Sequence, residues 1–103
     1  MPWPEMNDAL INSAVRVNLG CGNDRMDGFL NVDVVPGVKP DLVHDLNRFP
    51  YPFRDSQFEH VIAKDVIEHL EDMPAFMREV WRVLKPGGLL TMTTPFAPAC
   101  CAL

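Results

Sequence analysis

Short apolar runs separated by turn residues dominate the pattern of this chain. Five runs have the length of a strand and are rich in Val, Ile, Leu, Phe or Thr, at residues 15–19, 29–35, 41–43, 58–63 and 89–94. The first, second and fourth runs are apolar on both faces, which is typical of strands in a parallel sheet. Prolines and glycines lie between the runs, where turns are expected.

Two segments have a helical pattern. Asp72 is a suitable N-cap, Pro74 is tolerated in a first turn, and Lys85 and Gly87 suit the end of a helix. Apolar residues at helical spacing predict the buried stripe of this helix: Phe76, Met77, Val80, Trp81 and Leu84. A shorter helix is predicted from about Asp65 to Leu70, where residues 65–68 have the form of a capping box.

The order of strands and helices predicts an α/β fold, a Rossmann-like three-layer sandwich with a mainly parallel sheet. The connections at residues 20–28 and 47–57 are too short for a full crossover helix. We expect a single helical turn in the first connection and an irregular loop in the second.

Length and charge narrow the function. The 103 residues suffice for one domain, expected at residues 15–95, with an extension at 1–14 and a tail at 96–103. Fourteen acidic and nine scattered basic residues give a net charge of -5, which disfavours nucleic acid as a partner. Neither a signal peptide nor an apolar span is recognisable, so we expect a cytoplasmic protein without a membrane partner. Three cysteines lack the spacing of metal ligands.

A glycine-rich loop follows the first strand. Residues 18–23 read NLGCGN, and glycine there permits a sharp turn and close approach of a ligand to the backbone. Asp33 ends the next strand, where a carboxylate accepts hydrogen bonds from the two hydroxyls of a ribose. The pattern therefore predicts a site for a nucleoside at the carboxyl edge of the sheet.

Two classes of cofactor compete for this loop. A dinucleotide fingerprint requires a third glycine, but Arg25 stands at that position, and Asp33 follows Gly20 by only thirteen residues. A cofactor without phosphates fits this spacing better. A nicotinamide dinucleotide, and with it an oxidoreductase, is the less favoured alternative.

Seven motifs in a fixed order carry a resemblance to a known family. They are VNLGCG at residues 17–22, GFLNVD at 28–33, VHDL at 43–46, PF at 52–53, FEHVI at 58–62, EHL at 68–70 and LKPGG at 84–88. Together they resemble class I S-adenosylmethionine-dependent methyltransferases, particularly small bacterial ones with a shortened first crossover. The resemblance covers about residues 15–95.

The resemblance implies S-adenosylmethionine as cofactor and methyl transfer to a small-molecule acceptor. Gly20 and Gly22 would face the methionine portion, Asp33 the ribose, and Asp45 with Leu46 the adenine. Residues 63–65 would lie nearest the sulfonium. The expected cofactor-binding residues are Asn18, Gly20, Cys21, Gly22, Asp33, Val34, Asp45, Leu46, Lys64 and Asp65. Asn18 departs from the family, which usually has a carboxylate at that position.

Catalytic groups are harder to identify. Asp65, Glu68 and His69 share one helical face, so they could bind a divalent metal, or His69 could act as a general base. A helix cap followed by a packed histidine is the simpler interpretation, and we expect no metal. Asp65 and His69 are the candidates for catalysis. Cys21 has no identifiable base beside it and is interpreted as a packing residue.

The C-terminal side of the predicted domain is short. The resemblance implies further strands after the fifth, whereas Leu103 is the last residue given, so we expect a truncated sheet with an exposed fifth strand. Such an edge would permit a homodimer through residues 89–94. A domain that binds the cofactor without catalysis is the alternative function, because elements that recognise an acceptor would be missing.

Overall fold

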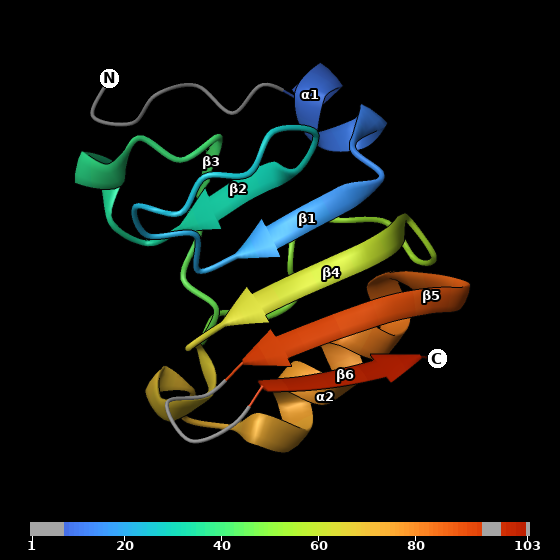
Figure 1. The fold of residues 1–103 in the computed structure, drawn as a ribbon. Helices are drawn as coiled ribbons and strands as arrows, with labels where there is room; N and C mark the ends of the chain where they lie inside the picture. Colours follow the sequence, from blue (N-terminus) through green and yellow to red (C-terminus); the bar gives the residue numbers. More distant parts are fainter. Residues whose placement is uncertain (1–7, 94–97, 103) are drawn as a thin grey trace.

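Figure 1 shows the fold in the computed structural model, which describes residues 8–93 and 98–102. The elements follow in the order α1 (Asp8–Ser13), β1 (Arg16–Leu19), β2 (Leu30–Asp33), η1 (Pro36–Val38), β3 (Leu42–Val43), β4 (Phe58–Lys64), η2 (Ile67–His69), α2 (Met73–Val83), β5 (Leu84–Thr93) and β6 (Pro98–Ala102). No helix in these residues is both long and apolar enough to pass through a membrane.

The strands form one sheet in the order β3-β2-β1-β4-β5-β6. The first five strands run parallel, and β6 pairs antiparallel with β5. In the central strand β1, Asn18 lies opposite Asn31 of β2 on one side and opposite Ile62 of β4 on the other. The predicted α/β fold with a mainly parallel sheet is therefore confirmed.

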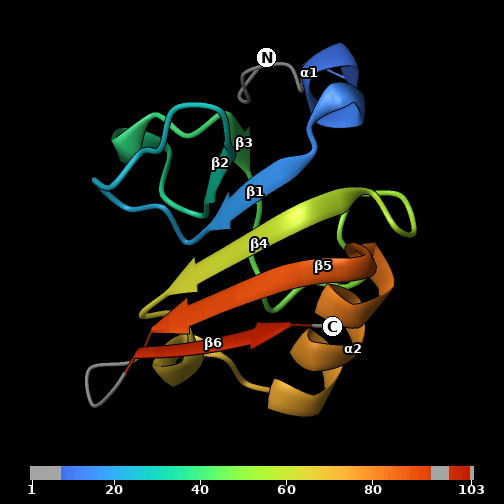
Figure 2. The same ribbon diagram turned by 45° about the vertical axis from the view of Figure 1, so that its right-hand side comes forward.

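The helix α2 packs against one face of the sheet beside β5 (Figure 2). Asp72 caps it as predicted, because its side chain accepts a hydrogen bond from the Ala75 N–H at 3.0 Å. Phe76 and Val80 are fully buried, but Trp81 is 67% exposed. The prediction that Trp81 belongs to the core is wrong, since the buried face is narrower than the apolar stripe. Leu84 is buried as expected, but the helix ends at Val83, before the predicted end at Lys85 and Gly87, and Leu84 begins β5.

Both predicted local helices near the loops differ from the structure. Residues 20–29 contain turns but no helical turn, whereas the connection at residues 47–57 is irregular as expected. A single 3-10 turn, η2, replaces the helix predicted from Asp65 to Leu70. Its N-cap is Val66, without a side-chain cap, so the predicted capping box is wrong. Asp65 instead has a left-handed backbone with φ 52°.

The far side of β5 is paired rather than open. Its residues from Leu89 to Thr93 pair with β6, so the expected exposed fifth-strand edge is wrong. Sequence patterns missed β6 because it lies in the stretch expected to be a tail. A homodimer through residues 89–94 stays an untested prediction. It would require β6 to leave the edge of β5 that it now pairs with. Residue 94 itself lies outside the described part of the chain.

The segment before β1 also joins the core. Ile11 of α1 is buried, and the side-chain amide of the buried Gln57 donates hydrogen bonds to the carbonyls of Ile11 at 2.6 Å and Ala14 at 3.0 Å. These bonds attach α1 to the start of β4.

Candidate functional site

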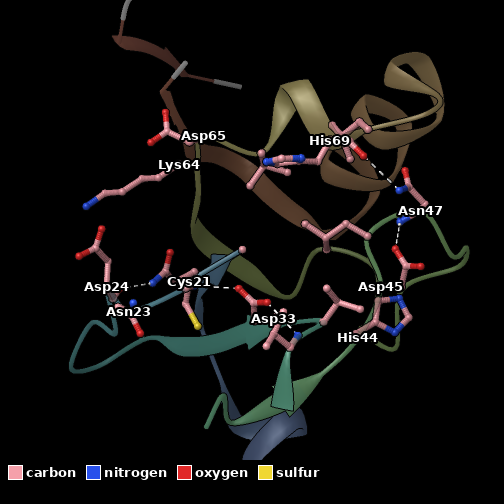
Figure 3. Close-up of a pocket in the computed structure, with 18 residues that line it drawn as sticks. Cys21, Asn23, Asp24, Asp33, His44, Asp45, Asn47, Lys64, Asp65 and His69 are labelled. Carbon is pink, nitrogen blue, oxygen red and sulfur yellow. Dashed lines mark hydrogen bonds between the residues drawn. The ribbon is translucent and has the colours of Figure 1, made fainter. Parts of the chain in front are cut away.

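One cavity of about 550 Å³ lies at the carboxyl ends of β1, β2, β3 and β4 (Figure 3). This is the edge at which open parallel sheets bind ligands, and the volume suits a small molecule. All ten residues predicted to contact a cofactor line it: Asn18, Gly20, Cys21, Gly22, Asp33, Val34, Asp45, Leu46, Lys64 and Asp65. The structure thus gathers the predicted set at one place.

Further lining residues are not among the predicted cofactor contacts. They are Asn23, Asp24, Val35, His44, Asn47, Val66, His69 and Leu70. His69 lies in the η2 turn and Leu70 follows it, and each of the others lies within two residues of a predicted contact in the sequence. Extending each motif along its loop would have found most of them, but no pattern in the sequence marks Asn47 or Val66 by itself.

The glycine loop has two left-handed residues, with φ 67° at Gly20 and φ 51° at Gly22. A Cβ at Gly20 would lie 2.6 Å from Cγ2 of Val66, so the loop and the segment after β4 pack tightly there. A Cβ at Gly22 would meet nothing within 4 Å. Packing against Val66 therefore requires glycine at position 20, whereas backbone conformation alone favours it at position 22.

Asp33 is tied to this loop. Its Oδ2 accepts a hydrogen bond from the Gly22 N–H at 2.8 Å, and its Oδ1 accepts one from the Val35 N–H at 2.9 Å. Each carboxylate oxygen keeps a second lone pair, because it has only one donor here. The carboxylate is thus held in a fixed orientation with acceptor capacity to spare.

Asn18 is the most buried polar residue of the pocket lining, with 1% of its surface exposed. Its Nδ2 donates to the Asp24 carbonyl at 2.9 Å and to Oδ1 of Asn31 at 3.1 Å. Its Oδ1 has no hydrogen-bond partner in the described part of the chain. A buried acceptor without a donor is costly, so this oxygen is a candidate to receive a hydrogen bond from a bound group.

The loop of Asp45 and Leu46 forms another wall. Asp45 Oδ1 accepts from the Asn47 N–H at 2.9 Å, and the hydroxyl of Tyr51 donates to the Leu46 carbonyl at 2.7 Å. Burial, with the charges of Glu79 and Asp45, raises the pKa of Tyr51, so its hydroxyl stays a donor. Tyr51 and the Phe49 ring stacked on it do not line the cavity, so they support this wall from beneath, whereas His44, whose ring also contacts Tyr51, does line it.

Arg82 of α2 supports that anchor. It donates to the Tyr51 carbonyl at 3.1 Å and forms an ion pair of 2.7 Å with Glu79, whose Oε2 accepts from the Tyr51 N–H at 2.7 Å. The Arg82 hydrogen bond lowers the pKa of Glu79. Glu79 and Arg82 of α2 thus fix the backbone of Tyr51, and the Tyr51 hydroxyl in turn binds the Leu46 carbonyl of the pocket wall.

Asn47 joins two walls of the pocket. Its Nδ2 donates to the His69 carbonyl at 3.2 Å, and its Oδ1 accepts from the Glu71 N–H at 2.9 Å. The connection is visible in Figure 3. The η2 turn is therefore held against the loop that follows β3.

The two catalytic candidates lie on the same pocket but are not paired with each other. Asp65 is held in its left-handed conformation by its N–H, which donates to the Thr93 carbonyl at 2.9 Å. His69 has an exposed ring 3.7 Å from a carboxylate oxygen of Glu68. No group of three potential ligands that could hold a metal ion occurs in residues 8–93 or 98–102.

The charge of the pocket is predominantly negative. Among the described residues, four carboxylates line it, from Asp24, Asp33, Asp45 and Asp65, against the lysine Lys64. Cys21 is buried among them, and burial together with the charge of Asp33 raises the pKa of its thiol. The thiol is therefore protonated at neutral pH, which supports its interpretation as a packing residue rather than a nucleophile.

A family model described as a methyltransferase domain matches residues 17–92. A probable S-adenosylmethionine-dependent methyltransferase of Mycolicibacterium smegmatis is 43% identical over 55 residues, which are 53% of this chain and 21% of that protein. A dimethylglycine N-methyltransferase of Parasynechococcus marenigrum is 38% identical over 69 residues, 66% of this chain and 24% of that protein. The chain thus spans about a quarter or less of these relatives.

Solved structures give the same fold. An S-adenosylmethionine-dependent methyltransferase of Mesorhizobium loti superposes with a TM-score of 0.64 at 19% identity, over 82% of this chain and 47% of that chain. A methyltransferase of Aquifex aeolicus superposes with a TM-score of 0.56 at 16% identity, over 80% and 57% of the two chains. The sheet, the pocket and the match over residues 17–92 agree, and this chain belongs to the methyltransferase domain family.

Proposed function

We propose that this domain binds S-adenosylmethionine in the pocket and transfers its methyl group to a small-molecule acceptor. The observation that carries the proposal is the buried Oδ1 of Asn18, an acceptor without a donor in the described residues, on the wall of a largely acidic pocket. The α-ammonium group of the cofactor supplies the donor that this oxygen lacks. Membership of the methyltransferase domain family and the Mycolicibacterium smegmatis relative, whose name gives this cofactor, support the same ligand.

The other residues also fit the cofactor. Asp33 has free acceptor capacity for two ribose hydroxyls, since each oxygen has one backbone donor. Leu46 and Val34 offer apolar surface on the walls, where an adenine ring can pack. The acidic lining suits a cationic sulfonium better than a phosphate, which disfavours a dinucleotide.

The cofactor supplies an activated methyl group, so the protein needs to align donor and acceptor and to exclude water. Asp33, fixed by the Gly22 N–H, would hold the ribose of the cofactor, and Asn18 would hold its ammonium group. Asp65 and His69 lie on the wall formed by the segment after β4, where they can accept a proton from an acceptor hydroxyl or amine.

Binding is tested by calorimetric titration of the chain with S-adenosylmethionine. We expect Asp33→Ala to weaken binding by about tenfold or more, because hydrogen bonds to a charged group contribute about 1.5–3 kcal/mol. Asp27→Ala is the matched control, since Asp27 is an exposed carboxylate in the connection between β1 and β2 that does not line the pocket. Equal binding by the parent and Asp33→Ala would contradict the assignment of the ribose.

Turnover is measured separately, as release of S-adenosylhomocysteine with a panel of small acceptors. Binding with no turnover for any acceptor favours a cofactor-binding module. Affinity for a nicotinamide dinucleotide in place of S-adenosylmethionine would favour an oxidoreductase.

A further inference from the structure

A chain of hydrogen bonds leads from the surface to the pocket through Asn31. This buried side chain has an orientation that backbone groups determine. Its Oδ1 accepts from the Met26 N–H at 2.9 Å, while its Nδ2 donates to the carbonyls of Met26 at 3.2 Å and Phe29 at 3.1 Å. Because a backbone N–H only donates and a carbonyl only accepts, the amide of Asn31 cannot be flipped without losing all three bonds.

The orientation of Asn31 determines that of Asn18. The Asn18 Nδ2 faces Oδ1 of Asn31 and the Asp24 carbonyl, which are both acceptors. Only the amino side of the Asn18 amide can satisfy them, so the oxygen is the atom left without a partner in the described residues.

An ion pair holds Asn31 from the other side. Asp41 Oδ2 accepts from the Asn31 N–H at 2.8 Å and from its Nδ2 at 3.1 Å, and Arg25 lies 3.0 Å from Asp41 Oδ1. Burial of Asp41 opposes its charge, but the hydrogen bonds from Asn31 and Arg25 outweigh burial and lower its pKa. The carboxylate therefore stays charged at neutral pH and accepts both hydrogen bonds from Asn31.

We propose that Asn31 is a positioning residue of the cofactor site, which turns the Asn18 amide so that its oxygen receives the ammonium group of the cofactor. The proposal rests on the proposed function. It also gives a physical reason for an amide at position 18, where the family resemblance implies a carboxylate. A carboxylate there would set an oxygen against the Asp24 carbonyl and Asn31 Oδ1, two acceptors that offer it no proton.

The test compares two ligands of the intact chain. S-adenosylmethionine has the ammonium group, whereas 5′-methylthioadenosine has the same nucleoside without the amino acid. Calorimetric titration gives the ratio of their dissociation constants. We expect Asn31→Ala to weaken binding of S-adenosylmethionine about tenfold and that of 5′-methylthioadenosine by less than about twofold. Equal losses for both ligands would overturn the proposal, because a purely structural role affects the whole pocket.

Asn18→Asp keeps the test decisive if Asn31→Ala does not fold. Simple attraction between a new carboxylate and the ammonium predicts tighter binding of S-adenosylmethionine, whereas the fixed acceptors around position 18 predict binding about tenfold weaker. Tighter binding would refute the role of Asn31.

Gln57→Ala is the control for loss of a buried amide, since Gln57 forms hydrogen bonds but does not line the pocket. We expect a lower Tm with an unchanged ratio of the two dissociation constants. A changed ratio would show that general loosening suffices and would overturn the proposal. If the parent chain binds neither ligand, the proposed function itself is refuted. If the parent binds both ligands but the ratio of their dissociation constants is unchanged in Asn31→Ala, only the role of Asn31 is refuted.

Discussion

The contact between Gly20 and Val66 allows a prediction with a built-in control. In Gly20→Ala the new Cβ lies in a left-handed conformation with φ 67° and 2.6 Å from Cγ2 of Val66. The left-handed conformation costs about 1–2 kcal/mol for a residue with a Cβ. Overpacking at such a distance adds about 1–3 kcal/mol. We expect the free energy of unfolding to fall by about 2–5 kcal/mol, a large part of the stability of a small domain.

Gly87→Ala isolates the first of these two costs. Its φ is 81°, and a Cβ there meets nothing within 4 Å, so only the backbone cost of about 1–2 kcal/mol applies. Urea denaturation followed by circular dichroism gives both values. The double variant Gly20→Ala with Val66→Ala removes the contact, and a double-mutant cycle should return about 1–3 kcal/mol of coupling. A Gly20→Ala cost no larger than that of Gly87→Ala, together with zero coupling, would refute the reasoning.

Three further outcomes are expected. Arg82 lowers the pKa of Glu79, so the contribution of Glu79 to stability is present above its unfolded pKa of about 4.5 and is lost as pH falls through the lower folded value. In a curve of unfolding free energy measured from about pH 3 to 7, Glu79→Gln should therefore reduce the loss of stability at acidic pH. An unchanged loss at acidic pH would contradict this role of Glu79. Burial raises the pKa of the Cys21 thiol, so Cys21 should react slowly with iodoacetamide at neutral pH, and more slowly still when S-adenosylmethionine is bound. Peptide mapping by mass spectrometry measures both rates. A labelling rate that does not change with the ligand would indicate that the ligand binds elsewhere. If His69 accepts the proton of an acceptor, His69→Gln should lower kcat about 100-fold or more and leave cofactor affinity within about twofold, and an unchanged kcat would remove it from the candidates.

Much of the fold could be read from the sequence because strand period, turn residues and caps agree in it. The first four parallel strands lie within a residue or two of their predicted positions, and Asp72 begins α2 as its residue type indicates. The pocket residues could be found because ordered motifs place them at the ends of adjacent strands.

The features that could not be read depend on tertiary contacts. Trp81 has the spacing of a core residue, but the sheet face beneath α2 is filled by Phe76, Val80 and Val83. Asp65 looks like a cap, yet its N–H pairs with Thr93 from a distant strand, which holds the backbone out of a helix. The Asn31 network likewise joins residues whose separation in sequence gives no periodic signal.

Part of the support of the pocket comes from the half of the chain that does not line it. Among the described residues, those that line the pocket all lie at or before Leu70, whereas α2 and β5 support the walls through Arg82 and Thr93. Substitutions in the second half can therefore alter rigidity while the recognition surface keeps its composition.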